Sequence, residues 1–358
     1  MKILHVITSL QTGGAEKLMV DLLPRLRNAG HEVELLVFDG TETPFMQDLR
    51  KSGIRICNLG IGGSVYSPMR LLRLVPYLRR YDVVHTHNTA PQLFAAIGSV
   101  LCSVVLCTTE HNTSNRRRAW RWYAPIDRWM YDRYRRVICI SHKAEENLRA
   151  FIGKSKAEIC TIYNGVDVVR YAGAPASPEL ETIAAGSRKI MMVAGFRWEK
   201  DQDTIIRALE LLPADFHLFL VGDGSRREEL AILAEQLGVA ARVHFMGVRT
   251  DVANLLHAAD YIVMSSHFEG LSLSSVEGMS VGKPFLASDV DGLREVVEDA
   301  GILFPHGDYQ ALATEIQHLE ASPETYTAVA AACRRQAIRY DISYMANGYA
   351  TMYKKLLK

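Results

Sequence analysis

Long hydrophobic runs are absent from this chain, although 48% of its 358 residues are hydrophobic. The longest run, residues 93–107, includes Gly98, Ser99 and Ser103. It is too short for a membrane-spanning helix and predicts a buried helix followed by a buried strand. The N-terminal segment also lacks the apolar core and the small-residue cleavage site of a secretory signal peptide. These absences favour a cytoplasmic protein.

Closely spaced cysteine pairs are absent as well. The six cysteines, at positions 57, 102, 107, 139, 160 and 333, include no Cys-x-x-Cys motif of the kind found in zinc sites and redox proteins. We expect reduced, mostly buried thiols, as in a cytosolic protein. Short repeats and low-complexity segments are also missing.

The net charge of +1 hides an asymmetry between the two halves of the chain. Residues 1–175 hold 24 Lys and Arg against 15 Asp and Glu, a net charge of +9, whereas the remaining residues carry −8. Halves of opposite sign suggest two domains with different partners. Attraction between the two halves is an alternative explanation.

Strand-like apolar runs alternate with helix-length segments along the chain, beginning with KILHVIT at residues 2–8. This alternation predicts parallel sheets covered by helices on both faces. It stops in the stretch VVRYAGAPASPELETIAAGSRK and then resumes, which indicates two α/β domains. Their carboxyl sheet edges are expected to meet at a cleft. The expected parts are a first domain at residues 1–168, a linker at 169–187, a second domain at 188–340 and a terminal helix at 341–358.

Two carboxylates lie in the stretch SSHFEGLSLSSVEGMSVGKP, residues 265–284, which is otherwise rich in small and apolar residues. Glu269 follows a predicted strand, at the edge where open α/β sheets bind ligands. Glu277 falls on the apolar arc of a predicted helix beginning near Leu273 or Ser274, so its charge needs a partner. A capping box formed by Ser274 and Glu277 explains the second glutamate equally well.

The same stretch resembles the signature of the family-4 glycosyltransferases, which are retaining enzymes of the GT-B fold. That signature is a Glu, seven residues, a second Glu, Gly-x-Pro and a Gly-containing turn, and here it reads Glu269, GLSLSSV, Glu277, GKP and SDVDGLREVV. The segments GGAEK, ISHKAEENL, IYNGVD, VGDGSRREEL and DVANLLHAAD also stand in family order. The resemblance implies two Rossmann-like domains with parallel sheets that face a central cleft.

The resemblance assigns Glu277 to the ribose hydroxyls of a nucleotide and Glu269 to the hydroxyls of the transferred sugar. A carboxylate suits both roles, because it accepts two hydroxyl hydrogen bonds in a fork geometry. Backbone amides after Glu269 would face the sugar and the diphosphate. The further donor-binding residues expected in the second domain are Gly222, Gly270, Leu271 and Ser272.

The family usually places an Arg, and five residues later a Lys, on the donor diphosphate. This chain has Lys200, but Gly195 stands where the Arg is expected. Arg197 is the expected substitute, and an ordinary surface charge is the alternative. A pair of cations matters because negative charge grows on the leaving diphosphate as the glycosidic bond breaks.

In the first domain, Gly13 and Gly14 separate the first strand from the first helix, where glycines permit close approach of a phosphate or an acceptor. A tight turn would explain them equally well. The resemblance places His111, just past a strand, at the reaction centre near the sugar, although a lone histidine is more often structural. His85 and His87 share one face of a strand, and neither needs to be catalytic.

Two Asp-x-Asp strings occur, at residues 201–203 and 289–291. Such strings suggest a divalent metal in the other major glycosyltransferase fold. Here the first lies at a predicted helix start, where acids favour the helix dipole, and in the second Asp291 could cap a helix. We therefore expect no metal and no cofactor besides the donor substrate.

The segment from Asn115 to Arg136 holds eight arginines against two acids, with three interleaved tryptophans. A solvated arginine face is one explanation. Nucleic acid is not expected, because no binding motif accompanies the charge. An anionic membrane surface or a lipid-diphosphate acceptor fits the composition better. A peripheral position on the inner face of the plasma membrane would follow.

These observations predict a retaining glycosyltransferase of the hexosyltransferase type. It would move a hexose from a UDP- or GDP-sugar to a hydroxyl of a lipid-linked or envelope glycan, in polysaccharide biosynthesis. One alternative is a sugar-nucleotide epimerase of the same fold, which would turn over its donor without an acceptor. The other is a non-catalytic sugar-nucleotide-binding subunit, for which the glycine at position 195 leaves room.

Overall fold

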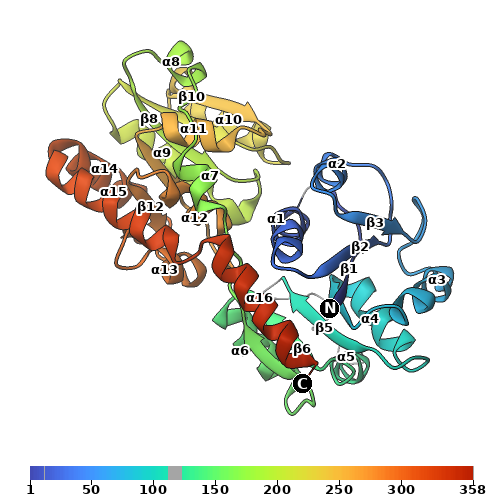
Figure 1. Ribbon diagram of the computed structural model, residues 1–358. Helices are drawn as coiled ribbons and strands as arrows, with labels where there is room; N and C mark the ends of the chain where they lie inside the picture. The colour runs from blue at the N-terminus through green and yellow to red at the C-terminus, as the bar shows by residue number, and fades with distance from the viewer. Residues whose placement is uncertain (12, 112–122, 358) are drawn as a thin grey trace. The chain divides into compact units, whose positions relative to one another are not determined.

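The computed structural model describes residues 1–11, 13–111 and 123–357. The chain divides into two compact units (Figure 1). Unit 1 consists of residues 1–165 together with 342–358, and unit 2 consists of residues 166–341. The segment expected as a linker, residues 169–187, contains two short helices and belongs to unit 2.

Unit 1 is built on a seven-stranded sheet in the order β3-β2-β1-β4-β5-β6-β7. Every adjacent pair of these strands is parallel. The strands are β1 (Lys2–Ile7), β2 (Glu32–Val37), β3 (Arg55–Asn58), β4 (Val83–His87), β5 (Val105–Glu110), β6 (Arg136–Cys139) and β7 (Glu158–Thr161). The helices are α1 (Gly14–Asn28), α2 (Pro44–Lys51), α3 (Pro68–Leu78), α4 (Thr89–Gly98), α5 (Ala124–Tyr131), α6 (His142–Ile152) and α16 (Ile342–Leu356).

The two faces of this sheet carry separate hydrophobic cores. One core packs the sheet against α1, α2 and α16, and the other packs it against α3 to α6. In α1 the buried residues Leu18, Leu22 and Leu26 recur every four positions, which places them on one helix face. Because helices cover both faces of the sheet, β4 is buried along its whole length, including the polar residues His85, Thr86 and His87.

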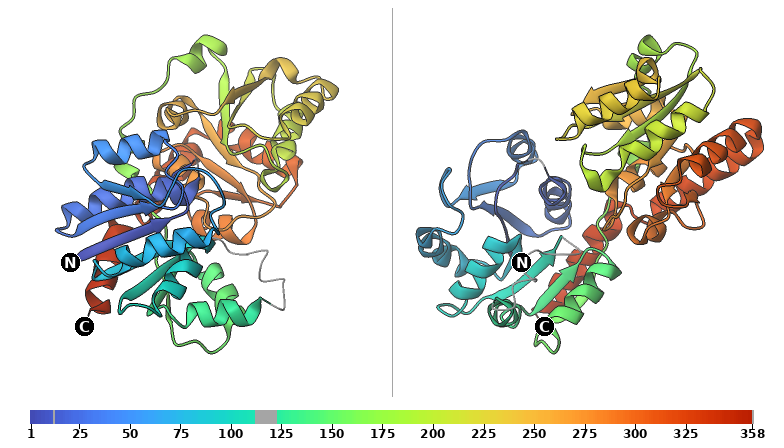
Figure 2. Two further views of the ribbon diagram at one scale, coloured as in Figure 1. Left: turned by 90° about the vertical axis from the view of Figure 1, so that its right-hand side faces the viewer. Right: turned by 180° about the vertical axis from the view of Figure 1, so that it is seen from behind.

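The last helix of the chain, α16, belongs to unit 1 although the preceding helices belong to unit 2. It packs beside α1, and both views of Figure 2 show it in red against the elements of unit 1. The fully buried Tyr349 and Tyr353 lie on its inner face. None of the helices in the described residues is both long enough and apolar enough to span a bilayer.

Unit 2 contains a six-stranded parallel sheet in the order β10-β9-β8-β11-β12-β13. The strands are β8 (Arg188–Val193), β9 (Phe216–Val221), β10 (Val243–Gly247), β11 (Tyr261–Met264), β12 (Phe285–Ser288) and β13 (Ile302–Phe304). The α-helices are α7 (Val168–Ala172), α8 (Glu179–Ile183), α9 (Gln202–Leu211), α10 (Arg227–Gln236), α11 (Val252–Ala258), α12 (Leu273–Ser280), α13 (Asp291–Val297), α14 (Tyr309–Ala321) and α15 (Pro323–Ile338). Two 3₁₀ turns, η2 (Trp198–Lys200) and η3 (Ala240–Arg242), complete the unit.

The expectation of two Rossmann-like domains with parallel sheets is confirmed. The strand order of unit 2 reverses at β8, because the chain runs outward from β8 to β10 and then returns to β11 on the other side. Open α/β sheets bind ligands beside such a reversal, at the carboxyl ends of the strands. The loops after β8 and β11 therefore lie where a ligand site is expected.

Candidate active site

Opposite charges meet at the carboxyl edge of the unit 2 sheet. Lys200 ends η2 in the connection after β8, and its Nζ forms an ion pair with Oε1 of Glu269 in the loop after β11. The Ser266 hydroxyl donates to the same carboxylate oxygen at 2.7 Å. Both charged side chains are largely covered, with 21% of Lys200 and 11% of Glu269 exposed. Partial burial strengthens such a pair and fixes the direction of both groups.

Glu277 lies on α12, and this helix begins at Leu273, one of the two starts expected from the sequence. The N-cap is Ser272, whose side chain accepts a 3.3 Å hydrogen bond from the Ser275 backbone amide. Ser274 therefore lies inside the helix, and the capping box of Ser274 with Glu277 was wrong. Glu277 is only 8% exposed, so its carboxylate needs a polar or charged partner.

Glycines bring the loops of this edge into close contact. Gly222 has φ of +141°, and a Cβ there would lie 2.1 Å from the Ala194 carbonyl oxygen, so a side chain would push apart the loops after β8 and β9. A Cβ on Gly292 would lie 1.8 Å from the carbonyl oxygen of Gly270. The start of α13 thus packs directly on the loop that carries Glu269. Motif spacing indicated Gly222 as a donor contact, whereas its geometry shows a structural need.

Arg197 lies close to the glycine that stands in place of the expected arginine. A Cβ built on Gly195 would lie 3.4 Å from Nε and 3.5 Å from Nη2 of Arg197. The guanidinium group of Arg197 thus lies where a side chain on residue 195 would begin. Arg197 is exposed, so its guanidinium can move toward an anion.

The loop after Glu269 contains the three other residues expected at the donor. Leu271 is 8% exposed and Ser272 is 5% exposed, while Gly270 is half-buried. Ser272 both caps α12 and accepts a 2.8 Å hydrogen bond from the Ser275 hydroxyl. These contacts hold the backbone of the loop at the N-terminus of α12, where unpaired amides favour an anion.

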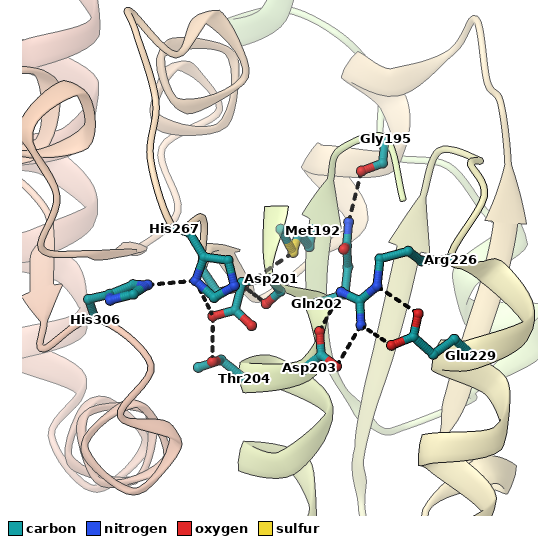
Figure 3. A network of polar contacts seen from close by, with 11 residues as sticks. Met192, Gly195, Asp201, Gln202, Asp203, Thr204, Arg226, Glu229, His267 and His306 are labelled. Atoms are coloured by element: carbon teal, nitrogen blue, oxygen red, sulfur yellow. Dashed lines mark hydrogen bonds and ion pairs between the residues drawn. The ribbon is translucent and has the colours of Figure 1, made fainter. Parts of the chain in front are cut away.

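Two of the four aspartates in the Asp-x-Asp strings, Asp203 and Asp289, accept hydrogen bonds from arginines. Burial alone would raise the pKa of Asp203, but two hydrogen bonds from Arg226, at 2.7 and 2.9 Å, outweigh it and lower that pKa (Figure 3). Asp289 accepts two 2.6 Å hydrogen bonds from Arg294. Asp291 begins α13, whose N-cap is Val290, so the expectation that Asp291 caps this helix was wrong.

Asp201 has different surroundings. It has φ of +49°, it is 3% exposed, and burial raises the pKa of its carboxyl group. Its side chain accepts a 2.6 Å hydrogen bond from the Thr204 hydroxyl and lies beside the imidazoles of His267 and His306 (Figure 3). Sequence reasoning missed these histidines, because no motif connects residues so far apart along the chain.

In unit 1, His111 ends a chain of hydrogen-bonded rings. His111 Nε2 lies 2.9 Å from His87 Nδ1, and His87 Nε2 lies 3.0 Å from His5 Nδ1. The Tyr353 hydroxyl of α16 then bridges His5 and His85, at 3.2 and 2.5 Å. Within this row of hydrogen-bonded rings, the imidazoles of His5, His85 and His87 are fully buried.

Burial keeps these imidazoles neutral. It lowers the pKa of His5 to about 3 and that of His111 to about 4, and it lowers the pKa of His85 and of His87 well below the ordinary value. A neutral imidazole donates at one nitrogen and accepts at the other, so the protons along the chain are ordered. At the His111 end of this row of rings, the buried Nδ1 has no hydrogen-bond partner among the described residues.

Glycines also begin the first helix of unit 1. Gly13 is the N-cap of α1 in an extended conformation, and a Cβ there would meet the Glu16 carboxylate at 2.2 Å. A Cβ on Gly14 would meet nothing within 4 Å. Packing within the described residues therefore does not require a glycine at position 14, which leaves room there for a ligand.

The arginine- and tryptophan-rich segment is only partly described. Arg116, Arg117 and Arg118, with Trp120 and Trp122, lie outside the described residues. In the part that is described, Trp129 on α5 is 38% exposed, and the Arg133 guanidinium lies 5.3 Å from its ring centroid. This contact is a cation–π interaction at the surface.

Comparison with known proteins agrees with this geometry. Residues 12–170 match the family model described as Glycosyltransferase Family 4, and residues 176–336 match the model described as Glycosyl transferases group 1. The chain belongs to the group 1, family 4 glycosyltransferases. This glycosyltransferase carries Glu269, Glu277 and Lys200 within the group 1 match, and His111 within the family 4 match.

The glycosyltransferase is similar to relatives along nearly its whole length. It is 26% identical to the putative glycosyltransferase EpsD of Bacillus subtilis, with 91% of this chain and 90% of EpsD covered. It is 23% identical to the UDP-Gal:alpha-D-GlcNAc-diphosphoundecaprenol alpha-1,3-galactosyltransferase of Escherichia coli, over 84% of this chain and 82% of that protein. The solved structure of Anabaena Alr3699/HepE in complex with UDP and glucose has a TM-score of 0.86 at 24% identity, over 99% of this chain and 100% of that one. The GT-B fold is therefore confirmed.

Proposed function

We propose that this glycosyltransferase transfers a hexose, with retention of configuration, from a UDP- or GDP-sugar to a hydroxyl of a lipid-linked or envelope glycan. The observation that carries the proposal is the ion pair of Lys200 with Glu269 at the carboxyl edge of the unit 2 sheet. A nucleotide-sugar site needs a cation to bind the diphosphate and, close beside it, a carboxylate to bind the sugar hydroxyls. The buried Glu277 on the neighbouring helix supplies the carboxylate for ribose.

Charge on the leaving group is offset by two side chains. Lys200 already lies in the site, and Arg197 lies beside Gly195 with its guanidinium exposed. When the bond between the sugar and the diphosphate breaks, negative charge develops on the phosphate oxygens, and cations fixed nearby lower the barrier. We therefore assign no metal ion to the donor diphosphate.

Retention does not require a protein nucleophile in this proposal. The departing diphosphate accepts the proton of the acceptor hydroxyl on the same face of the sugar, while positive charge builds on the ring. Glu269 is held by Lys200 and Ser266, which favours hydrogen bonding to sugar hydroxyls over covalent attack. In unit 1, His111 is the residue proposed for the reaction, through its Nδ1, which has no hydrogen-bond partner among the described residues.

The acceptor class is suggested by a relative and by charge. The Escherichia coli relative is named for a sugar acceptor on diphosphoundecaprenol, and its name gives UDP-galactose as the donor. Unit 1 holds 26 Lys and Arg against 14 Asp and Glu, a net charge of +12, whereas unit 2 has a net charge of −11. A strongly basic unit suits a lipid diphosphate or the anionic membrane that contains it.

The proposal is tested by incubating the protein with UDP- and GDP-hexoses and a sugar linked to a lipid diphosphate. We expect release of nucleoside diphosphate that depends on the acceptor, and a product whose anomeric configuration, determined by NMR, matches that of the donor. Inversion would contradict the retaining mechanism. Donor turnover without an acceptor would favour the epimerase alternative, and donor binding without turnover would favour a non-catalytic subunit.

A further inference from the structure

Three side chains from three loops of unit 2 converge beside the proposed donor site. Asp201 follows β8, His267 follows β11 and His306 follows β13, all at the carboxyl edge of the sheet. One potential ligand atom from each lies within 4.8 Å of the other two. His267 Nδ1 is 2.6 Å from His306 Nε2 and 3.7 Å from Asp201 Oδ2 (Figure 3).

From this arrangement we propose that Asp201, His267 and His306 bind a divalent transition-metal ion, with zinc as the best match. Two imidazoles and one carboxylate form a donor set that zinc accepts with a fourth position left open. Imidazole ligands favour zinc, copper, nickel and iron over magnesium and calcium, which prefer oxygen.

The observed spacing needs little change to hold such an ion. Ligand atoms about 2.1 Å from a tetrahedral zinc ion lie roughly 3.4 Å apart. The separation of 3.7 Å between His267 and Asp201 is already close to this value, and the separation of 2.6 Å between the two histidines must open by less than about 1 Å. His306 is exposed, so rotation of its side chain can supply this movement and gives the ion a path of entry.

The charges at the site favour a cation. The Asp201 carboxylate is buried, and within the described part of the chain no lysine or arginine pairs with it. The adjacent Lys200 pairs with Glu269 instead. A hydrogen bond between the two imidazoles accounts for the contact of His267 with His306. Among the described residues, the hydrogen bonds to the Asp201 carboxylate come from Thr204, and His267 lies 3.7 Å away.

Neighbouring groups fix the ligands in place, as the surroundings of metal sites commonly do. Thr204 donates to Asp201 Oδ2, and the Ser265 hydroxyl donates to the Asp201 carbonyl oxygen at 2.6 Å. The His267 amide donates to the Glu199 carbonyl oxygen at 2.9 Å, and the Trp198 ring packs on the imidazole with the centroids 4.5 Å apart. The first two ligands are therefore positioned before an ion arrives.

A bound ion would tie together the three loops that carry the donor site. Lys200 directly precedes Asp201, and Glu269 lies two residues after His267, so the ion would set the distance between Lys200 and Glu269. This effect on the donor rests on the proposed function, whereas binding of the ion does not. The proposal departs from our expectation of no metal, which weighed only the aspartate pairs and not the histidines.

Metal binding is measured on the full chain after dialysis against a chelator, by titration with Zn²⁺ in competition with a coloured zinc indicator. We expect one Zn²⁺ per chain, bound at least a hundredfold more tightly than Mg²⁺. His306→Ala and Asp201→Asn should each weaken binding tenfold or more. The matched control is His244→Ala, because His217 and His244 form another imidazole pair in unit 2, at 2.9 Å, outside this triad.

Two further measurements locate the ion. Co²⁺ bound at this site should show a spectrum of nitrogen and oxygen ligands, and a thiolate charge-transfer band would assign the metal to the cysteines and overturn the proposal. Zn²⁺ should raise the melting temperature of the parent and the control but not of His306→Ala. Binding that neither variant weakens would place the ion elsewhere, for instance at the buried histidines of unit 1, and would also overturn it. A failed sugar transfer leaves these binding results unchanged.

Discussion

At the scale of single residues, the carboxyl edge of the unit 2 sheet places Lys200 and Glu269 in contact across 69 positions of sequence. Each side chain satisfies the charge of the other. In the proposed function, donor binding would exchange this ion pair for charged hydrogen bonds to the diphosphate and the sugar. The residues around this pair offer two sharp tests of the donor site.

The first test concerns Arg197 and Gly195. Arg197→Ala should weaken binding of the nucleoside diphosphate about tenfold or more, because a hydrogen bond to a charged group contributes roughly 1.5–3 kcal/mol. Adding Gly195→Arg to this variant should recover affinity, since the nearest atoms to a Cβ at that position belong to Arg197 itself. Calorimetry with UDP and GDP measures both effects. The exposed Arg335→Ala is the control, and equal affinity in all four proteins would return Arg197 to an ordinary surface charge.

The second test concerns Glu277. Glu277→Ala should lower affinity for the preferred nucleotide by roughly 1.5–3 kcal/mol, because the ribose hydroxyls lose a charged acceptor. Calorimetry with UDP and GDP gives the affinity, and thermal unfolding shows whether the fold is kept. Glu298→Ala, at an exposed position after α13, should bind normally. An unchanged affinity of the Glu277 variant would remove this residue from the donor site.

At the scale of elements, α16 connects the end of the chain to the centre of unit 1. Its Tyr353 hydroxyl contacts His5 on β1 and His85 on β4, two residues paired in register in the sheet. Its Tyr349 hydroxyl lies 3.1 Å from Thr109 Oγ1 on β5. The helix thus contributes polar partners to the sheet as well as apolar packing. It thereby satisfies buried ring nitrogens that the sheet alone would leave without partners.

Because the Tyr353 hydroxyl of α16 contacts two buried histidines, its removal should lower the stability of unit 1. Tyr353→Phe keeps the packing but removes the hydroxyl, so two buried ring nitrogens lose a partner, at a cost of about 1–3 kcal/mol of unfolding free energy. Chemical denaturation measures the loss. Tyr344→Phe on the same helix is the control, because Tyr344 is 62% exposed. Equal stability of both variants would show that the hydrogen-bonded chain does not depend on this hydroxyl.

At the scale of the whole molecule, the four histidines of the hydrogen-bonded chain make unit 1 sensitive to acid. Their folded pKa values lie below the ordinary 6.5, at about 3 for His5 and about 4 for His111, because burial disfavours the charged form. Below pH 6.5 the unfolded chain therefore binds protons that the folded unit does not. The contribution of these histidines to the free energy of unfolding is fully present above pH 6.5 and is lost progressively as the pH drops toward 4.

Each such histidine should cost about 1.4 kcal/mol of unfolding free energy per pH unit below about 6.5. Hydrogen exchange at about pH 7.5 and about pH 5.5, on either side of that value, tests this after correction for the intrinsic exchange rate. We expect protection of β1 and β4 to fall more than protection of β8 and β9, although burial also lowers the pKa of His217 on β9 and of its partner His244, because unit 1 holds four such histidines in one network. Equal losses in both units would contradict the assignment of neutral, buried imidazoles to unit 1.

The opposite net charges of the two units, +12 and −11, are larger than the asymmetry of the sequence halves, because α16 and the C-terminal residue add lysines to unit 1. We expect cosedimentation with vesicles rich in acidic lipid and little with neutral ones, since each basic residue near the surface contributes about 1 kcal/mol. Replacing Arg116, Arg117 and Arg118 with Ser should reduce vesicle binding and leave nucleotide affinity intact. Equal vesicle binding by variant and parent would exclude this segment as the contact.

Much of the fold was predictable because its signals are local. The alternation of apolar runs and helical segments indicated two parallel α/β domains, and the helix after Glu269 begins at Leu273, within the expected pair of positions. The Asp-x-Asp strings and the Ser274–Glu277 spacing were less informative. Asp203 and Asp289 of these strings accept hydrogen bonds from Arg226 and Arg294, and Ser272 rather than Ser274 caps the helix. These contacts depend on the tertiary structure, and no short motif encodes them.

The sequence by itself determined the class of fold, the membership in a glycosyltransferase family and the main candidates for the donor site, because strand periodicity and motif spacing act over a few residues. Only the tertiary structure decided which distant groups meet. It brought Asp201 to His267 and His306, and it brought Tyr353 to His5 across 348 positions. Strand order and the return of α16 to unit 1 set these contacts, and both depend on how the whole chain packs its apolar faces.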